Sequence, residues 1–226
     1  MPEHSTIRNL AQAIISESPA TEEALDTSVA GPDGSDVVRA LLKWPDGRVR
    51  FWAMNKAESV LPQAEFVRYL RSAAHDADDA VSAEAVSRLA VVDPGFIRRR
   101  VRALRAKLKE DGPSGQKILA IWTLCRVASK ESIASIEGLR SAEPNWTKLA
   151  RVADVAIRYL RDGGDQILND IRLRADHDHM EELCTLAWFV IADDKARQTL
   201  EECAASASDD RWKRECAYGL TRFGES

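Results

Sequence analysis

One apolar pattern recurs along the chain and constrains its fold more than any other feature. Five segments carry bulky apolar residues at positions i and i+3, and the match returns every 31 to 35 residues. The residue four positions before each segment is small. A period of this length predicts stacked helical hairpins, each of which buries its apolar side against its neighbours. The segments are LAVV (89–92), LCRV (124–127), IRYL (157–160), WFVI (188–191) and LTRF (220–223), and the small residues are Ala85, Ala120, Ala153, Cys184 and Cys216.

The turn residues between apolar stretches place the individual helices. Asp93-Pro94-Gly95, Asp111-Gly112-Pro113 and Glu143-Pro144-Asn145 are turn sequences, and such short connections favour antiparallel neighbours. We therefore predict an all-α stack of helix pairs with a single closing helix. The expected pairs are 80–91 with 94–110, 114–128 with 130–141, 146–161 with 163–174 and 179–191 with 193–206, followed by 210–223.

The first 79 residues do not follow the repeat, and we divide the chain into residues 1–36, 37–79 and 80–226. An amphipathic helix is expected at 5–17, followed by a flexible linker at 21–36. Within 38–54, Pro45-Asp46-Gly47 is a turn tripeptide and the alternation that follows it suits a half-buried strand. We expect a small β-hairpin there, although its first arm also fits a capped helix. Pro62 then opens a further helix.

Two stretches resemble a known repeat family. DDRWKRECAYGLTRFG (209–224) resembles the first helix of a HEAT-type repeat, and LAVVDPGFI (89–97) resembles the turn between its two helices. The resemblance covers residues 80–224 and extends to armadillo-type repeats, but Ser129-Lys130 and Asp162-Gly163-Gly164 depart from the usual turn. It implies a right-handed α-α superhelix of about four to five hairpins that serves as a protein-binding scaffold, and it supplies no catalytic residues.

The strongest charge feature is FIRRRVRALRAKLK (96–109), a predicted second helix with a buried stripe of Ile97, Val101, Leu104 and Leu108. By analogy with the family, second helices line a concave groove, and these cations would bind a partner there. The alternative is a solvated face paired with acidic turns. Trp146 and Trp212 open two first helices and are expected to be partly exposed. The candidate partner-binding residues are Arg98, Arg99, Arg102, Arg105, Lys109, Trp146 and Trp212.

Other motifs indicate no chemistry. Asp176-His177-Asp178-His179 has the spacing of a polar turn, so we predict no metal site. The sequence contains neither of the glycine-rich phosphate-binding motifs, G-x-x-x-x-G-K-[ST] and G-x-G-x-x-G. We therefore expect no catalytic residue and no cofactor. The four cysteines lack C-x-x-C spacing, which favours reduced core thiols. The absence of a long apolar run or a signal sequence leads us to expect a cytoplasmic protein.

These features favour a non-enzymatic interaction scaffold that presents a charged groove to a protein or peptide. The alternative is a HEAT-like DNA glycosylase or nucleic-acid binder that uses helix 96–109, which the net charge of −4 does not favour. A HEAT-like tetrapyrrole lyase or chaperone is a third hypothesis, but the sequence contains no specific motif that supports it. The unpaired last helix is expected to be covered by the N-terminal segment, a second copy or a partner.

Overall fold

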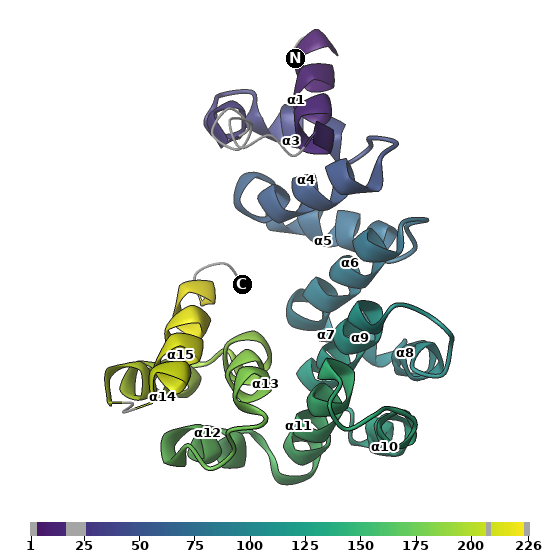
Figure 1. The fold of residues 1–226 in the computed structure, drawn as a ribbon. Coiled ribbons are helices and arrows are strands. Elements are labelled where there is room, and N and C mark those ends of the chain that lie inside the picture. Colours follow the sequence, from purple (N-terminus) through teal and green to yellow (C-terminus); the bar gives the residue numbers. More distant parts are fainter. Residues whose placement is uncertain (1–3, 17–25, 207–208, 224–226) are drawn as a thin grey trace. The chain divides into compact units, whose positions relative to one another are not determined.

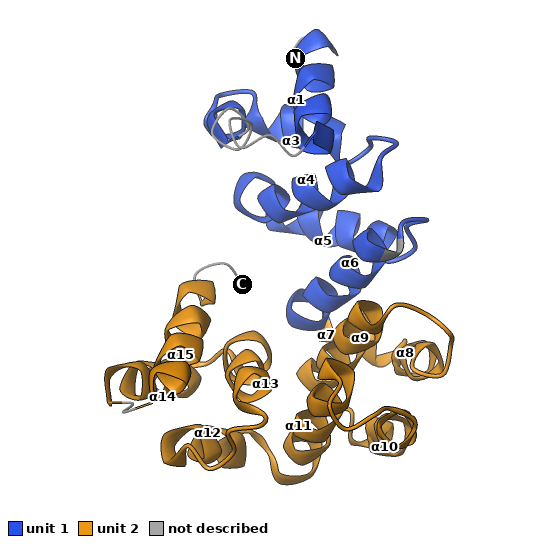
Figure 2. Cartoon of the chain, viewed as in Figure 1, with its two compact units in different colours: residues 1–93 blue, residues 94–226 orange. Residues whose placement is uncertain are grey.

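The computed structural model describes residues 4–16, 26–206 and 209–223, and all their regular elements are helices. The all-α class is therefore as predicted. The chain divides into two compact units, residues 1–93 and residues 94–226 (Figure 2). None of the helices among the described residues is long and apolar enough to cross a membrane.

Unit 1 is built from helices that pack mainly on their sequence neighbours (Figure 1). α3 pairs with α4 and α5 pairs with α6, while α1 packs against α3 and α4. The helices are α1 (His4–Ser16), α3 (Gly34–Leu41), α4 (Gly47–Val60), α5 (Gln63–Ala73) and α6 (Asp79–Val92).

The predicted β-hairpin at 38–54 is wrong, because this stretch belongs to α3 and α4 and to the turn between them. The Asp46 carboxylate accepts a hydrogen bond from the Arg48 backbone N–H at 2.9 Å and caps α4. The buried residues of α4 are Val49, Ala53, Met54 and Ala57, which follow the helical period.

The flexible linker predicted at 21–36 is also wrong where it can be compared. Residues 26–30 are helical and α3 begins at Gly34, where an added Cβ would lie 1.8 Å from the Val29 carbonyl oxygen. Only glycine allows this approach of two backbone segments. Residues 21–25 lie outside the described residues.

Arg50 connects the turn before α4 to the turn before α6. Its guanidinium donates to the Trp44 and Pro45 carbonyl oxygens, both at 2.7 Å, and to both carboxylate oxygens of Asp76 at 2.9 and 2.6 Å. Burial alone would raise the pKa of Asp76, but the hydrogen bonds from Arg50 and from the Asp78 backbone N–H outweigh it and hold that pKa below its usual range. This ion pair therefore stabilises the helical arrangement of the 38–54 stretch.

Unit 2 contains helices at the positions predicted from their turns. Three of the predicted helices are not continuous α-helices. The stretch 94–110 divides into α7 and α8, 130–141 begins as the 3-10 helix η1 and continues as α10, and 179–191 continues from α13 into a π-helix, η2. The elements are α7 (Pro94–Arg98), α8 (Val101–Lys107), α9 (Ser114–Arg126), η1 (Lys130–Ser132), α10 (Ile133–Ala142), α11 (Lys148–Asp162), α12 (Gly164–Leu173), α13 (Met180–Thr185), η2 (Leu186–Ile191), α14 (Asp194–Ser206) and α15 (Asp210–Arg222).

The first helices of unit 2 (α9, α11, α13 with η2, and α15) form a continuous layer. α9 contacts α11 and η2, α11 contacts α13, and α13 contacts α15. The small residues Ala120, Ala153, Cys184 and Cys216 are all buried in these helices, which permits their close approach. The second helices α8, α10, α12 and α14 lie on the outer side of this layer (Figure 1).

The expectation that second helices line a concave groove is therefore wrong for unit 2. Figure 1 shows the first helices on the inner side of unit 2, where their small buried residues permit close approach. The basic second helix, α8, packs on α9 and belongs to the outer side (Figure 1).

Three of the repeated signatures are followed by a residue with positive φ, which ends the first helix. These residues are Ala128 (φ 50°), Gly163 (φ 88°) and Ala192 (φ 51°). Glycine adopts this conformation without a Cβ penalty, whereas alanine does not. The two alanines are therefore strained helix ends.

The Arg50–Asp76 ion pair leads to a stability prediction. Asp76→Asn should lower the free energy of unfolding by about 2 kcal/mol at neutral pH, because it leaves a largely buried guanidinium without its carboxylate. The difference from the wild type should shrink as the pH falls through the lowered pKa of Asp76, since the stabilisation requires the ionised carboxylate. Urea unfolding at several pH values measures this, with the more exposed Asp36→Asn as a control that should change stability far less.

The strained helix ends lead to a second prediction. Ala192→Gly should raise the free energy of unfolding by roughly 0.5–1 kcal/mol, because glycine removes the left-handed strain at an exposed helix end. Ala106→Gly, at an exposed position with ordinary helical geometry in α8, should lower it by up to about 1 kcal/mol. Thermal unfolding that gives both variants the same sign of change would contradict the argument.

Candidate interaction surface

The basic segment, residues 98–109, takes its exposed cations from the packing of α7 and α8. Ile97, Val101, Leu104 and Leu108 are buried, as the apolar stripe predicts. The intervening side chains must then face solvent. Arg98, Arg99, Arg102, Lys107 and Lys109 are exposed, whereas Arg100 and Arg105 are half-buried.

The exposed cations of the basic segment have no carboxylate partner within the described residues. No ion pair involves Arg98, Arg99, Arg102, Lys107 or Lys109 there. The half-buried Arg105 donates to the Ser135 hydroxyl at 3.1 Å, which joins α8 to α10. These five side chains are therefore solvated, but they lack the salt bridges to acidic turns that the alternative included.

Arginines elsewhere behave differently. Ten of them outside the basic segment pair with carboxylates in the described chain: Arg39, Arg48, Arg50, Arg71, Arg88, Arg140, Arg151, Arg158, Arg161 and Arg172. A protein rich in acidic residues thus pairs many of its arginines internally, whereas the cations of the basic segment and Arg211, Lys213 and Arg214 of α15 are exposed without an ion pair among the described residues. The basic segment holds the larger of these two groups, which makes it the leading candidate for binding.

The two tryptophans predicted at the surface have different environments. Trp146 lies in the turn before α11 and is 79% exposed, as expected. Trp212 is 0% exposed, so its predicted exposure is wrong, and its ring lies edge-on to His177 with the ring centroids 6.0 Å apart. The difference arises because Trp212 is already within α15 and faces the core, whereas Trp146 precedes its helix.

The Asp176–His179 turn joins an ionic cluster that the sequence did not reveal. His179 Nδ1 lies 2.9 Å from Asp176, His179 Nε2 lies 3.6 Å from Asp154, and Arg158 also pairs with Asp176. Burial would raise the pKa of Asp176, but hydrogen bonds from His179 and Arg158 hold it below its usual range. No group of three or more His, Cys, Asp or Glu side chains is placed to hold a metal ion in the described ranges. The cluster connects α11 to the turn before α13.

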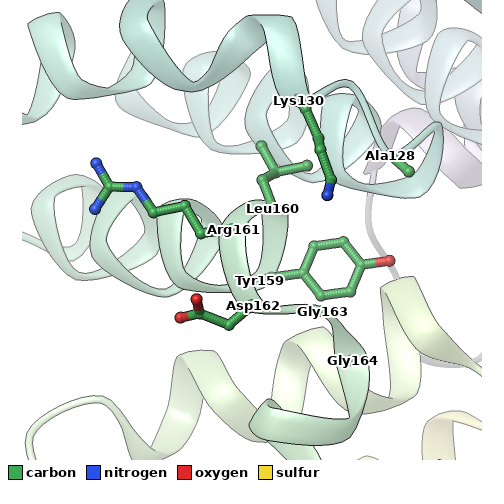
Figure 3. A pocket seen from close by; sticks show the side chains of 8 residues that line it. All are labelled: Ala128, Lys130, Tyr159, Leu160, Arg161, Asp162, Gly163 and Gly164. Carbon is green, nitrogen blue, oxygen red and sulfur yellow. The ribbon is translucent and has the colours of Figure 1, made fainter.

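A small pocket of about 190 Å³ lies at the ends of α9 and α11 (Figure 3). The Lys130 amine and the Tyr159 ring lie beside it, whereas Arg161 and Asp162 point away from them (Figure 3). Its volume is below the roughly 300–1,000 Å³ typical of ligand pockets. It is therefore a weaker candidate than the basic segment. The lining residues are Ala128, Lys130, Tyr159, Leu160, Arg161, Asp162, Gly163 and Gly164.

The last helix, α15, has an outer side that is largely polar. Arg211, Lys213, Arg214 and Thr221 are exposed there, and Tyr218 is 56% exposed. A polar outer face is what terminal repeats require for solubility. Coverage of this end by the N-terminal segment, a second copy or a partner stays a prediction.

Comparisons with protein-family models, curated proteins and solved structures give no match to this chain.

The two tryptophans should differ in their effect on stability. Trp212→Ala should lower the free energy of unfolding by about 3–5 kcal/mol, because it leaves a large cavity in the core. Trp146→Ala should change it by no more than about 0.5 kcal/mol, since that side chain is mostly in water. Chemical denaturation of both variants measures this, and a large loss with Trp146→Ala would place that ring in the core instead.

Proposed function

We propose that this protein is a non-enzymatic interaction module that binds an acidic protein segment through its basic segment. The observation that carries the proposal is the group of five exposed cations without a carboxylate partner among the described residues. Such a group attracts anionic partners and lowers the electrostatic cost of desolvating their carboxylates.

The neighbouring helix α10 extends this surface. Arg105 reaches Ser135 on α10, and the exposed positions of that helix are Ala134, Gly138, Ser141 and Ala142. These side chains are short, and a Cβ added at Gly138 would meet no atom within 4 Å. An extended peptide can therefore approach the α10 backbone closely.

Trp146 supplies an apolar anchor beyond the end of α10. It is 79% exposed, and tryptophan is over-represented among residues that dominate binding energy. The cations of the basic segment lie near one end of α10, and the Trp146 ring lies beyond its other end. We infer that together they recognise an acidic segment that also carries an apolar residue.

A nucleic acid is the alternative partner for the same cations. Backbone phosphates would pair with Arg98, Arg99 and Arg102 as well as carboxylates do. The chain has a net charge of −4, and the basic segment is followed directly by Glu110 and Asp111, both exposed. These charges disfavour a long polyanion more than a short acidic peptide.

The proposal is tested by fluorescence anisotropy with two labelled probes, a Glu-rich peptide that contains one Trp and a DNA duplex. Arg98, Arg99 and Arg102 are replaced together by Glu. This variant should bind the peptide at least about tenfold more weakly, because three attractions become repulsions. Trp146→Ala should weaken it roughly fivefold or more.

A matched control reverses the same number of exposed cations on α15, by replacing Arg211, Lys213 and Arg214 with Glu. Its net charge equals that of the test variant, so an equal loss of peptide binding would show a nonspecific charge effect and overturn the proposal. Tighter binding to the duplex than to the peptide, lost in the same triple variant, would favour the nucleic-acid alternative.

A further inference from the structure

Two of the small residues that precede the repeated signatures are cysteines in neighbouring first helices. Cys184 lies in α13 and Cys216 in α15, whereas the corresponding position is Ala120 in α9 and Ala153 in α11. Because α13 packs directly on α15, the repeat places these two thiols opposite each other. The position that is alanine in α9 and α11 is thus cysteine in α13 and α15.

The two sulfur atoms are already close. Cys184 Sγ lies 3.7 Å from Cys216 Sγ, and the two side chains are 2% and 0% exposed. A disulfide bond is about 2.05 Å long, so the two sulfurs need to approach by roughly 1.7 Å. Changes of side-chain rotamer and small helix shifts can provide a displacement of that size.

We propose that Cys184 and Cys216 form an intramolecular disulfide when the protein meets a peroxide. This modification site would fasten the last helix to its neighbour in the first-helix layer. It is independent of the proposed binding surface, because it uses residues of α13 and α15 alone.

A third thiol, that of Cys203, and the Arg174 guanidinium also lie near the Cys184–Cys216 pair. Cys203 in α14 is buried and also interacts with Cys216, so it competes for the same partner. The Arg174 guanidinium acts on both of these thiols, and its buried Nε has no hydrogen-bond partner among the described residues. A nearby cation stabilises a thiolate against the cost of burial. Cys125 lies apart in α9, where burial raises the pKa of its thiol.

The chemistry balances with hydrogen peroxide as the oxidant. One cysteine thiol loses its proton, and its thiolate attacks the peroxide. The O–O bond breaks to give a sulfenic acid and hydroxide, and the hydroxide takes up the thiol proton to become water. The second thiol then attacks the sulfenic sulfur, the S–S bond forms, and the hydroxyl leaves with the thiol proton as a second water. Two thiols lose two electrons in total, and these reduce one peroxide.

The reaction should be slow and should accelerate at alkaline pH. The hydrogen bond with the Cys184 thiol is the largest of the influences that raise the pKa of Cys216, and burial acts in the same direction. Only the thiolate attacks the peroxide, so its scarcity limits the rate.

The test treats the folded full-length chain with hydrogen peroxide at mildly alkaline pH, blocks the remaining thiols under denaturing conditions, and maps the tryptic peptides without reduction. The expected product is a link between peptides 175–195 and 215–222, which contain Cys184 and Cys216. The intact chain should lose the mass of two hydrogen atoms. Its melting temperature should rise by roughly 5–10 °C and fall again with dithiothreitol.

Alanine is the matched replacement, because the preceding repeats carry it at this position. Cys184→Ala and Cys216→Ala should each abolish the link and the rise in melting temperature, whereas Cys125→Ala and Cys203→Ala should retain both. The peptide map of the oxidised wild-type chain identifies the linked cysteines directly, so the proposal stays testable even if a variant fails to fold. A link from peptide 198–211, which contains Cys203, to Cys216, or four unmodified thiols, would overturn the assignment.

Discussion

The close packing of the first helices is the constraint on which unit 2 depends. Ala120, Ala153, Cys184 and Cys216 occupy the same position in successive helices, and all are buried. A larger side chain at any of them would force neighbouring helices apart, because a packed interior has almost no free volume. The same small residues place the second helices, including the basic segment, on the outer side of unit 2 (Figure 1).

This packing determines which charged side chains form ion pairs and which stay unpaired. Arg140–Asp154 and Arg151–Glu182 are ion pairs between one helix pair and the next, and Arg158–Asp170 joins the two helices of one pair. The exposed cations of the basic segment, in contrast, form no ion pair in the described part of the chain. The proposed binding surface therefore arises from the position of its helix as much as from its composition.

The layer of first helices also underlies the proposed redox chemistry. Cys184 and Cys216 occupy matching positions in two neighbouring first helices, and the packing of those helices brings their sulfur atoms together. The sequence places each cysteine in a helix, but only the packing of α13 on α15 shows that their sulfurs meet. Candidate disulfides in helical repeats can therefore be sought at equivalent positions of consecutive units.

The sequence by itself determined the helical class, the helices of unit 2 and the inward stripe of the basic segment, because these depend on local periodicity and turn residues. Tertiary structure decided the rest. The alternation after Asp46 fits a strand or a helix over so few residues, and contacts from distant parts of the chain, such as Asp76 on Arg50, favour the helix. Trp146 and Trp212 both stand near the start of a first helix, yet one faces solvent and the other the core. Burial and pairing depend on which helices become neighbours, and no short stretch of sequence contains that information.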